Sequence, residues 1–324
     1  MNKVKYSYMD HWEIQTPRGL MSPMVRKESL ERFLKQLVVM GYEGLDTFAM
    51  KLPMYARLIG GEKGTAVDFE HYIQDLGLEC MTSMFRDFIG YNPNEHVWEH
   101  RCHDRILEKY RQDCEYAKGT GIKTFVVMPS SQYFWCMDEK GEITDDVIHA
   151  HADLWNRVGK MMMEDYGIYL SCHHEFWSGL RDLEVIKKFY AWTDPKYVYY
   201  FCDTAQHVIA GVDPVDVYDM LADRTRCFHL KDTRNTDPGS YKIPPDAECL
   251  AKDVNRWFYE AGSGKGLCDF PKLFEAMKRH NYCGWISSEH DKAEMEGKSF
   301  SDCTGVSMWY VKNVLDPILD KEEK

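Results

Sequence analysis

The sequence predicts an α/β fold, a (β/α)8 barrel of the TIM-barrel type, formed as a single domain. Eight short segments rich in β-branched and aromatic residues recur along the 324 residues, and helix-like segments lie between them. This length agrees with that of a barrel of eight strand–helix units, and no linker or low-complexity stretch divides the chain. A doubly wound sheet is the alternative, but no glycine-rich turn follows the first predicted strand.

The predicted strands are short runs in which valine, isoleucine, tyrosine and phenylalanine favour extended structure. They are VKYSYM (4–9), YEGLDTF (42–48), LECMTSMF (78–85), KTFVVMP (123–129), GIYLSCH (167–173), YVYYFCD (197–203), TRCFHL (225–230) and GWISSE (284–289). The segments between them carry helix signals, which makes the alternation regular. We expect one barrel domain over residues 1–324, with a C-terminal helical extension after the eighth strand.

Two kinds of signal mark the predicted helices. One apolar face recurs at the spacing i, i+3, i+4, i+7, formed by Leu30, Phe33, Leu34 and Leu37. Elsewhere an aspartate stands where a helix N-cap is expected: Asp213 precedes a proline, and Asp269 precedes FPKLFEAMKRH.

Composition excludes several classes of partner. Lys and Arg number 40 against 52 Asp and Glu, and the resulting charge of −12 disfavours a nucleic-acid partner. The 11 cysteines are scattered and form no CxxC pair, which is typical of reduced thiols in a cytoplasmic protein. No apolar run of about 18 residues exists, and the first residues contain no apolar signal core, so we expect a cytoplasmic protein with no membrane span.

In a barrel of this type the active site lies at the carboxyl ends of the strands. The last four predicted strands all end in residues that bind metals or transfer protons. These are His173-His174-Glu175, Asp203 with Gln206 close behind, His229 with Lys231, and Glu289-His290. The second predicted strand ends around Asp46, and Trp12 follows the first. Four consecutive strands with such endings predict a shared site.

Strand geometry narrows the roles of these residues. Residues i and i+2 share a face, so His173 and Glu175 point the same way and His174 points the other way. His229 and Lys231 share a face for the same reason. Carboxylates with imidazole and without thiolates suit one divalent ion, Mn²⁺ first, with Co²⁺ or Mg²⁺ as alternatives.

Three motifs carry a family resemblance. CDTAQHVIAGVDP (202–214), FHLKD (228–232) and GWISSEHD (284–291) resemble the sugar-phosphate isomerase/epimerase superfamily of xylose-isomerase-like barrels, and inosose dehydratase in particular. The resemblance implies that one divalent ion is held at the ends of strands five to eight. The matching positions are the 173/175 pair, Asp203, His229 and Glu289.

The chain departs from that pattern at two positions. The superfamily commonly has a glutamate where His173 stands, so we assign Glu175 as the ligand and His173 as the catalytic base, with the exchanged roles as the alternative. Gln206 stands where relatives often carry histidine, and we expect its amide to bond a substrate hydroxyl.

Three further residues are expected to contact substrate. His290 is placed to orient a hydroxyl, and Trp12 to form a flat wall for a ring. Asp46 is expected to contact substrate, although an aspartate at a strand end also often caps the next helix.

The longer pattern CHHEFWSGL, FYAWTDPKYV, DTAQHVIAGVDP, FHLKD and EHDKAE most resembles the catalytic subunit of C-glycoside deglycosidases. That resemblance implies a lyase that cleaves the C-linked aglycone from a 3-oxo glucoside, and a small β-rich partner subunit in a hetero-oligomer. His173 would take the proton at C2, the enolate would expel the group at C1, and Lys231 would stabilise an oxyanion or protonate it. The alternatives are an epimerase or isomerase of a keto sugar and an inosose-type dehydratase.

Overall fold

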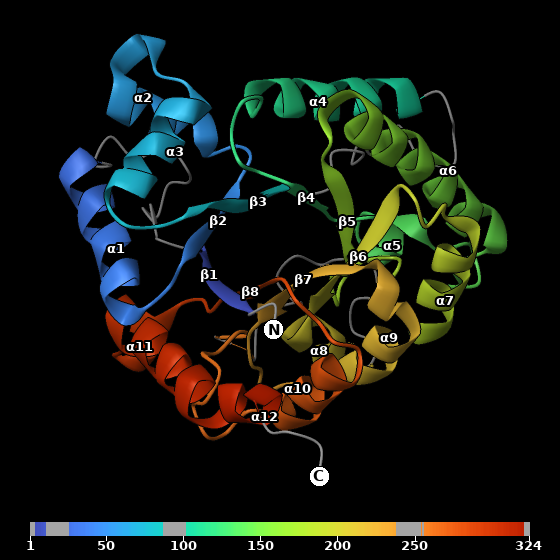
Figure 1. Ribbon diagram of the computed structural model, residues 1–324. Helices are drawn as coiled ribbons and strands as arrows, with labels where there is room; N and C mark the ends of the chain where they lie inside the picture. Colours follow the sequence, from blue (N-terminus) through green and yellow to red (C-terminus); the bar gives the residue numbers. More distant parts are fainter. Residues whose placement is uncertain (1–3, 11–25, 87–101, 238–253, 255, 321–324) are drawn as a thin grey trace.

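The computed structural model describes residues 4–10, 26–86, 102–237, 254 and 256–320. Eight parallel strands form a closed barrel in which every strand pairs with its sequence neighbours and β1 pairs with β8 (Figure 1). The strands are β1 (Lys5–Met9), β2 (Gly44–Phe48), β3 (Cys80–Arg86), β4 (Thr124–Val127), β5 (Tyr169–His173), β6 (Val198–Asp203), β7 (Thr225–Leu230) and β8 (Trp285–Ser288). The predicted barrel is confirmed, and each strand lies within or next to its predicted run.

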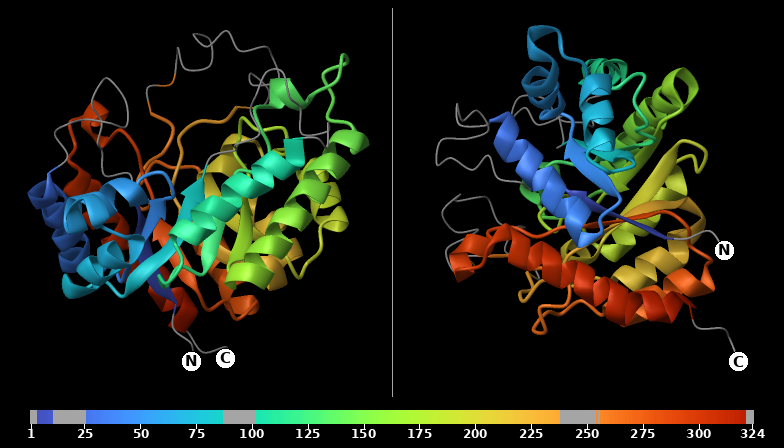
Figure 2. Two further views of the ribbon diagram at one scale, coloured as in Figure 1. Left: turned by 90° about the horizontal axis from the view of Figure 1, so that it is seen from above. Right: turned by 60° about the vertical axis from the view of Figure 1, so that its left-hand side comes forward.

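Helices form the outer layer. They are α1 (Lys27–Met40), α2 (Leu52–Gly60), α3 (Ala66–Asp75), α4 (His103–Tyr116), α5 (Tyr133–Cys136), α6 (Asp145–Met161), α7 (Leu183–Trp192), α8 (Thr204–Ile209), α9 (Pro214–Leu221), α10 (Phe270–Arg279), α11 (Phe300–Tyr310) and α12 (Asp316–Asp320). Short 3-10 or π segments are η1 (Gly61–Lys63), η3 (Met162–Tyr166), η4 (Ala222–Arg224), η6 (Ala293–Glu296) and η7 (Val311–Leu315). A C-terminal helical extension was predicted after β8. Its helix α11 packs against α1, which closes the outer ring of helices (Figure 2).

The helix signals read from the sequence act as expected. The buried face of α1 consists of Leu30, Phe33, Leu34 and Leu37. The carboxylate of Asp213 accepts the backbone N–H of Val215 at 2.8 Å, which caps α9 beside its first proline. Asp269 caps α10 in the same way, through the N–H of Lys272 at 3.0 Å.

Strand alternation decides which side chains face the barrel axis. His173 points inward at the end of β5, whereas His174 lies on the helix side, with Nδ1 2.7 Å from the carbonyl of Leu180. At the end of β7, His229 points inward and Phe228 packs outward on Tyr218 of α9. The inward residues at the strand ends therefore share one enclosed space.

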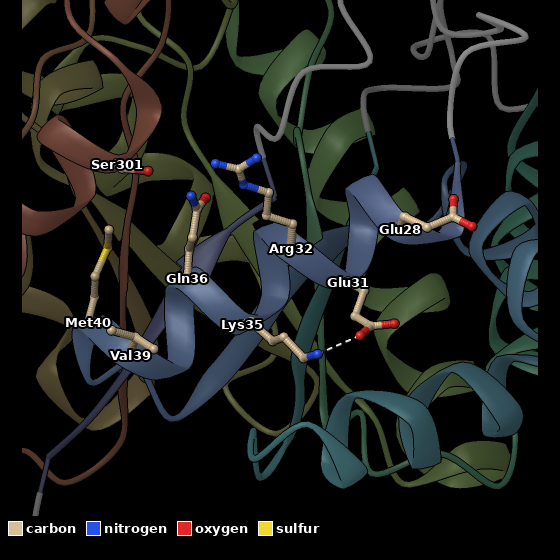
Figure 3. Close-up of a pocket in the computed structure, with 8 residues that line it drawn as sticks. All are labelled: Glu28, Glu31, Arg32, Lys35, Gln36, Val39, Met40 and Ser301. Atoms are coloured by element: carbon tan, nitrogen blue, oxygen red, sulfur yellow. Dashed lines mark hydrogen bonds and ion pairs between the residues drawn. The ribbon is translucent and has the colours of Figure 1, made fainter.

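A shallow groove lies on the outer surface of the helix ring, along α1 and beside Ser301 of α11 (Figure 3). Its volume is about 490 Å³. Charged side chains of both signs line it, and Val39 at its end is 86% exposed. The groove shares no residue with the strand ends.

Among the helices of the described part of the chain, none combines the length and apolar character needed to cross a bilayer.

Candidate active site

Acidic and imidazole side chains from different strands meet inside the carboxyl end of the barrel. They come from the middle of β2, from the carboxyl ends of β5, β6 and β7, and from the residue after β8. They are Asp46, His173, Asp203, His229 and Glu289, and all are at most 5% exposed. The closed barrel brings together side chains that are more than 200 residues apart in the sequence.

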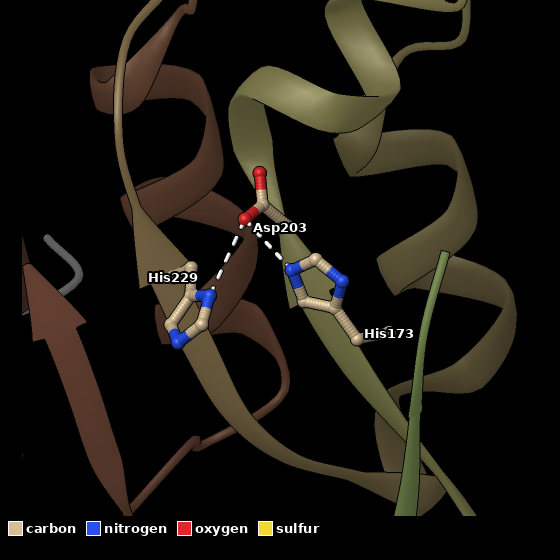
Figure 4. A group of neighbouring side chains, drawn as sticks. All are labelled: His173, Asp203 and His229. Carbon is tan, nitrogen blue, oxygen red and sulfur yellow. Dashed lines mark hydrogen bonds and ion pairs between the residues drawn. The ribbon is translucent and has the colours of Figure 1, made fainter. Parts of the chain in front are cut away.

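Three of these side chains converge most closely (Figure 4). One donor atom from each of His173, Asp203 and His229 lies within 4.8 Å of the other two. Oδ2 of Asp203 is 2.9 Å from Nε2 of His173 and 3.4 Å from Nδ1 of His229. The carboxylate thus lies between two ring nitrogens.

Each imidazole also meets a carboxylate at its second ring nitrogen. Nδ1 of His173 lies 3.2 Å from Oε1 of Glu175. Nε2 of His229 lies 2.9 Å from Oδ2 of Asp46. Carboxylates in these outer positions orient the imidazole ligands of many metal sites.

Lys231 places a buried ammonium group beside this cluster. Its Nζ lies 3.0 Å from Oδ2 of Asp203 and 2.9 Å from Oε2 of Glu289, over the ring of Phe258. Burial alone would lower the pKa of Lys231, but the carboxylates of Asp203 and Glu289 outweigh it and raise the pKa. The lysine therefore stays charged across the physiological range.

The same balance governs the two inward histidines. Burial disfavours their charged forms, but the facing carboxylates outweigh it. They raise the pKa of His173, and they raise the pKa of His229 well above its usual range. Burial would raise the pKa of Asp203, yet Lys231 and the imidazoles hold it far below the usual range. The enclosed space therefore favours added positive charge.

These side chains fit a divalent cation. Nδ1 of His229 is buried and makes no hydrogen bond within the described residues, although an oxygen of Glu289 is 2.8 Å away. The site contains four carboxylates and one ammonium group, that of Lys231, so negative charge is in excess. The carboxylates are those of Asp46, Glu175, Asp203 and Glu289. Two imidazoles and a carboxylate without a thiolate suit Zn²⁺, Co²⁺ or Mn²⁺. His173, Asp203 and His229 are thus a possible site for one such ion.

Most residues singled out from the sequence meet here. Asp46, Glu175 and Lys231 join the four positions expected to lie at the ends of β5 to β8. The close group differs from the expected ligands in two respects. It contains His173, the residue expected to act as base, and it leaves out both Glu175 and Glu289.

Two of the other expected substrate contacts, His290 and Gln206, do not join the group. Nδ1 of His290 is 3.1 Å from the hydroxyl of Tyr8, and its ring packs near Phe300 on the helix side of β8. Oε1 of Gln206 accepts the backbone N–H of Phe176 at 3.0 Å. Trp12 lies outside the described residues.

Sequence reasoning missed several neighbours of the cluster. Ser83 on β3 donates to Oδ1 of Asp46. The rings of Phe85 and Phe201 pack on the two imidazoles, with centroids 5.4 Å from His173 and 4.4 Å from His229. The sequence contained a signal for Ser83 and Phe85. They occupy alternate positions near the end of the third predicted strand, so they share one face of it.

Comparison with known proteins identifies the family. A family described as xylose isomerase-like TIM barrel matches residues 34–301, so the chain belongs to it. The inosose dehydratase of Lacticaseibacillus casei is 23% identical over 298 residues, which cover 87% of this chain and 92% of that protein.

Solved structures show the same fold. The IOLI protein with a binding zinc atom has a TM-score of 0.70 at 13% identity, covering 98% of this chain and 100% of that one. The 3-keto-D-glucoside 4-epimerase of E. coli has a TM-score of 0.62 at 16% identity, covering 96% and 99%. The resemblance to the sugar phosphate isomerase/epimerase superfamily is thereby confirmed, and the chain is an enzyme of this isomerase, epimerase and dehydratase group.

Proposed function

We propose that this protein removes a proton from the carbon next to the ketone of a 3-oxo sugar glycoside and then expels the C-linked group at C1. The reaction is that of a carbon–carbon lyase of the C-glycoside deglycosidase type. The observation that carries the proposal is the convergence of two imidazoles, four carboxylates and one ammonium group in a single buried space.

Removing a proton next to a carbonyl requires a base and a means of stabilising negative charge on oxygen. We assign His173, Asp203 and His229 to hold a divalent ion, with Mn²⁺ as our first choice. When bound, such an ion supplies a Lewis acid beside the substrate oxygens. The zinc atom in the IOLI structure supports a divalent ion in this fold.

The catalytic base in this assignment is Glu175, so the roles of Glu175 and His173 are exchanged relative to the first expectation. Both ring nitrogens of His173 face carboxylates, which leaves neither directed at a substrate. Oε1 of Glu175 contacts His173, whereas Oε2 makes no hydrogen bond or ion pair with another described residue. That oxygen is available to take the proton at C2.

Lys231 completes the proposed chemistry. Loss of the C2 proton gives an enolate with its charge on the C3 oxygen, and the buried ammonium group stabilises that charge. As the enolate collapses, a double bond forms between C1 and C2 and the bond from C1 to the aglycone breaks. The aglycone carbon then needs a proton, and Lys231 is the charged donor in this space.

A second candidate shares the first step. The L. casei relative is an inosose dehydratase, and one structural neighbour is a 3-keto-glucoside 4-epimerase. A dehydratase would expel water after the same proton removal, and an epimerase would return the proton to the opposite face. All three reactions therefore begin with removal of a proton next to a ketone. An epimerase acting at C4 would take it from C4 instead of C2, and the step after enolate formation then separates the three reactions.

The test uses the purified chain with a 3-oxo C-glucoside in D2O, with and without a small β-rich partner chain. NMR would follow deuterium at the carbons next to the ketone, and chromatography would follow the free aglycone. Metal content is measured on wild type, His173→Ala and Glu175→Gln. We expect one ion in wild type, loss of the ion in His173→Ala, and a Glu175→Gln variant that retains the ion and loses deuterium exchange by about 100-fold or more.

For each part of the proposal, one experimental result would contradict it. Deuterium exchange without aglycone release, even with the partner chain present, would replace the lyase with an epimerase or dehydratase. A Glu175→Gln variant that loses the ion would restore the first assignment, in which His173 is the base. A wild type that neither binds a divalent ion nor exchanges deuterium would end the proposal.

A further inference from the structure

We infer that Asp46 and Ser83 form a positioning pair that holds the imidazole of His229 in the tautomer and orientation of a metal ligand. The inference rests on the metal site in the proposed function and assigns two residues outside the three that would hold the ion. It gives Asp46 a role other than the substrate contact expected from the sequence.

Both oxygens of Asp46 are occupied. Oδ2 accepts a hydrogen bond from Nε2 of His229 at 2.9 Å, and Oδ1 accepts one from the hydroxyl of Ser83. Asp46 is fully buried and Ser83 is 1% exposed. A carboxylate whose two oxygens already have protein partners is poorly suited to bind a substrate hydroxyl as well.

Asp46 does not act as a helix cap either. The next helix, α2, has Lys51 at its N-cap position, and no side chain caps it by a hydrogen bond. The alternative reading of a strand-end aspartate is therefore excluded here. The contact across the barrel to His229 remains as the function of this carboxylate.

An irregularity in strand pairing creates the serine contact. β2 and β3 pair Leu45 with Met81, but the next pair is Asp46 with Ser83, so Thr82 is an extra residue on β3. The shift brings the hydroxyl of Ser83 beside Asp46 in place of Thr82, whose own hydroxyl bonds the carbonyl of Leu45. Bulges of this kind often aim a side chain at a functional site.

The contact selects one tautomer of His229. In the neutral ring that a metal ion requires, a hydrogen bond donated by Nε2 leaves the lone pair on Nδ1. Nδ1 is the nitrogen facing Asp203 at 3.4 Å and Glu289 at 2.8 Å. A metal ligand needs that lone pair directed into the site. β2 and β7 are not neighbours in the barrel, so Asp46 fixes the ring from across the closed space.

The experiment measures metal affinity in the full chain. Co²⁺ and Zn²⁺ are each titrated against a competing chelator into wild type, Asp46→Asn, Asp46→Ala and Ser83→Ala. The visible absorption of bound Co²⁺ is recorded for each protein. We expect affinity to fall by about 10- to 100-fold in Asp46→Ala, with an altered Co²⁺ spectrum, and by a smaller factor in Ser83→Ala. Asp46→Asn tests the charge in nearly the same volume if Asp46→Ala does not fold.

Thr47→Val is the matched control, because Thr47 is the adjacent buried residue of β2 and bonds Asp10 at 3.3 Å on the other face. We expect its metal affinity and Co²⁺ spectrum to match wild type even if its thermal midpoint falls. Asp46 variants that bind within twofold of wild type, or a Thr47→Val variant that weakens binding equally, would overturn the positioning role. If wild type itself binds no ion, the proposed function fails first and the inference fails with it.

Discussion

Lys231 shows how single side chains set the chemistry of this barrel. Its ammonium group lies between Asp203 and Glu289, at 3.0 and 2.9 Å, and is almost completely buried. A buried charge is tolerated only where opposite charges compensate for lost hydration. The two ion pairs hold the ammonium group beside the possible metal site. The three residues that could hold the ion remain His173, Asp203 and His229.

We predict that Lys231→Met lowers turnover by about 100-fold or more, because the enolate loses its charged partner. Metal content should remain, since Lys231 is not among the close donors. Lys188→Met, which removes an exposed lysine paired with Asp145, serves as the control and should keep full turnover. Turnover of Lys231→Met within tenfold of wild type would remove this residue from the reaction.

At the scale of elements, close packing of helices on the barrel depends on small residues. Gly159 in α6 lies against the backbone carbonyl of Tyr197, just before β6. A Cβ atom built at Gly159 would be 2.3 Å from that oxygen, a contact that a backbone group cannot easily relieve. Gly305 in α11 offers the contrast, because nothing lies within 4 Å of a Cβ built there.

This contrast predicts opposite effects of the same substitution. Gly159→Ala should lower the free energy of unfolding by about 1–3 kcal/mol, because overpacking outweighs the gain in helix propensity. Gly305→Ala should raise it by up to about 1 kcal/mol, because only the propensity gain applies. Urea denaturation of both variants checks the pair, and stabilisation by Gly159→Ala would contradict the packing argument.

At the scale of the whole molecule, buried ion pairs link stability to pH. Glu260 is 2% exposed and accepts hydrogen bonds from Arg256 and Lys298, both at 2.8 Å. Burial would raise the pKa of Glu260, but Lys298 and Arg256 lower it from 4.5 to about 2. The carboxylate is therefore more acidic in the folded chain than in the unfolded one. Its contribution to stability is present above pH 4.5 and is lost as the pH falls toward 2.

We predict that Glu260→Gln lowers the free energy of unfolding near pH 7 by about 3 kcal/mol. The difference from wild type should shrink as the pH falls below about 4.5, because wild type then protonates the same group. Urea denaturation between pH 7 and pH 3.5 measures the difference. Glu184→Gln, which breaks an exposed pair with Lys187, should change stability by less than about 1 kcal/mol at every pH. A constant difference for Glu260→Gln would refute the linkage.

The sequence by itself determined the eight strands, the inward face of each strand end and the residue types available there. These features are local: side chains alternate along a strand, and the apolar face of α1 recurs with the helical period. His173, Asp203, His229 and Glu289 could be placed at one site because parallel strands in a barrel end at the same mouth.

Only the tertiary structure decided which partner each side chain takes. Asp46 meets His229 across the barrel, and an irregular strand pairing brings Ser83 to Asp46. His290 follows Glu289 directly and so points to the opposite side, toward Tyr8. The close grouping of His173 with Asp203 depends on the distance between neighbouring strands. Sequence periodicity specifies a face, whereas barrel closure and strand register specify the distances between atoms that are far apart in the chain.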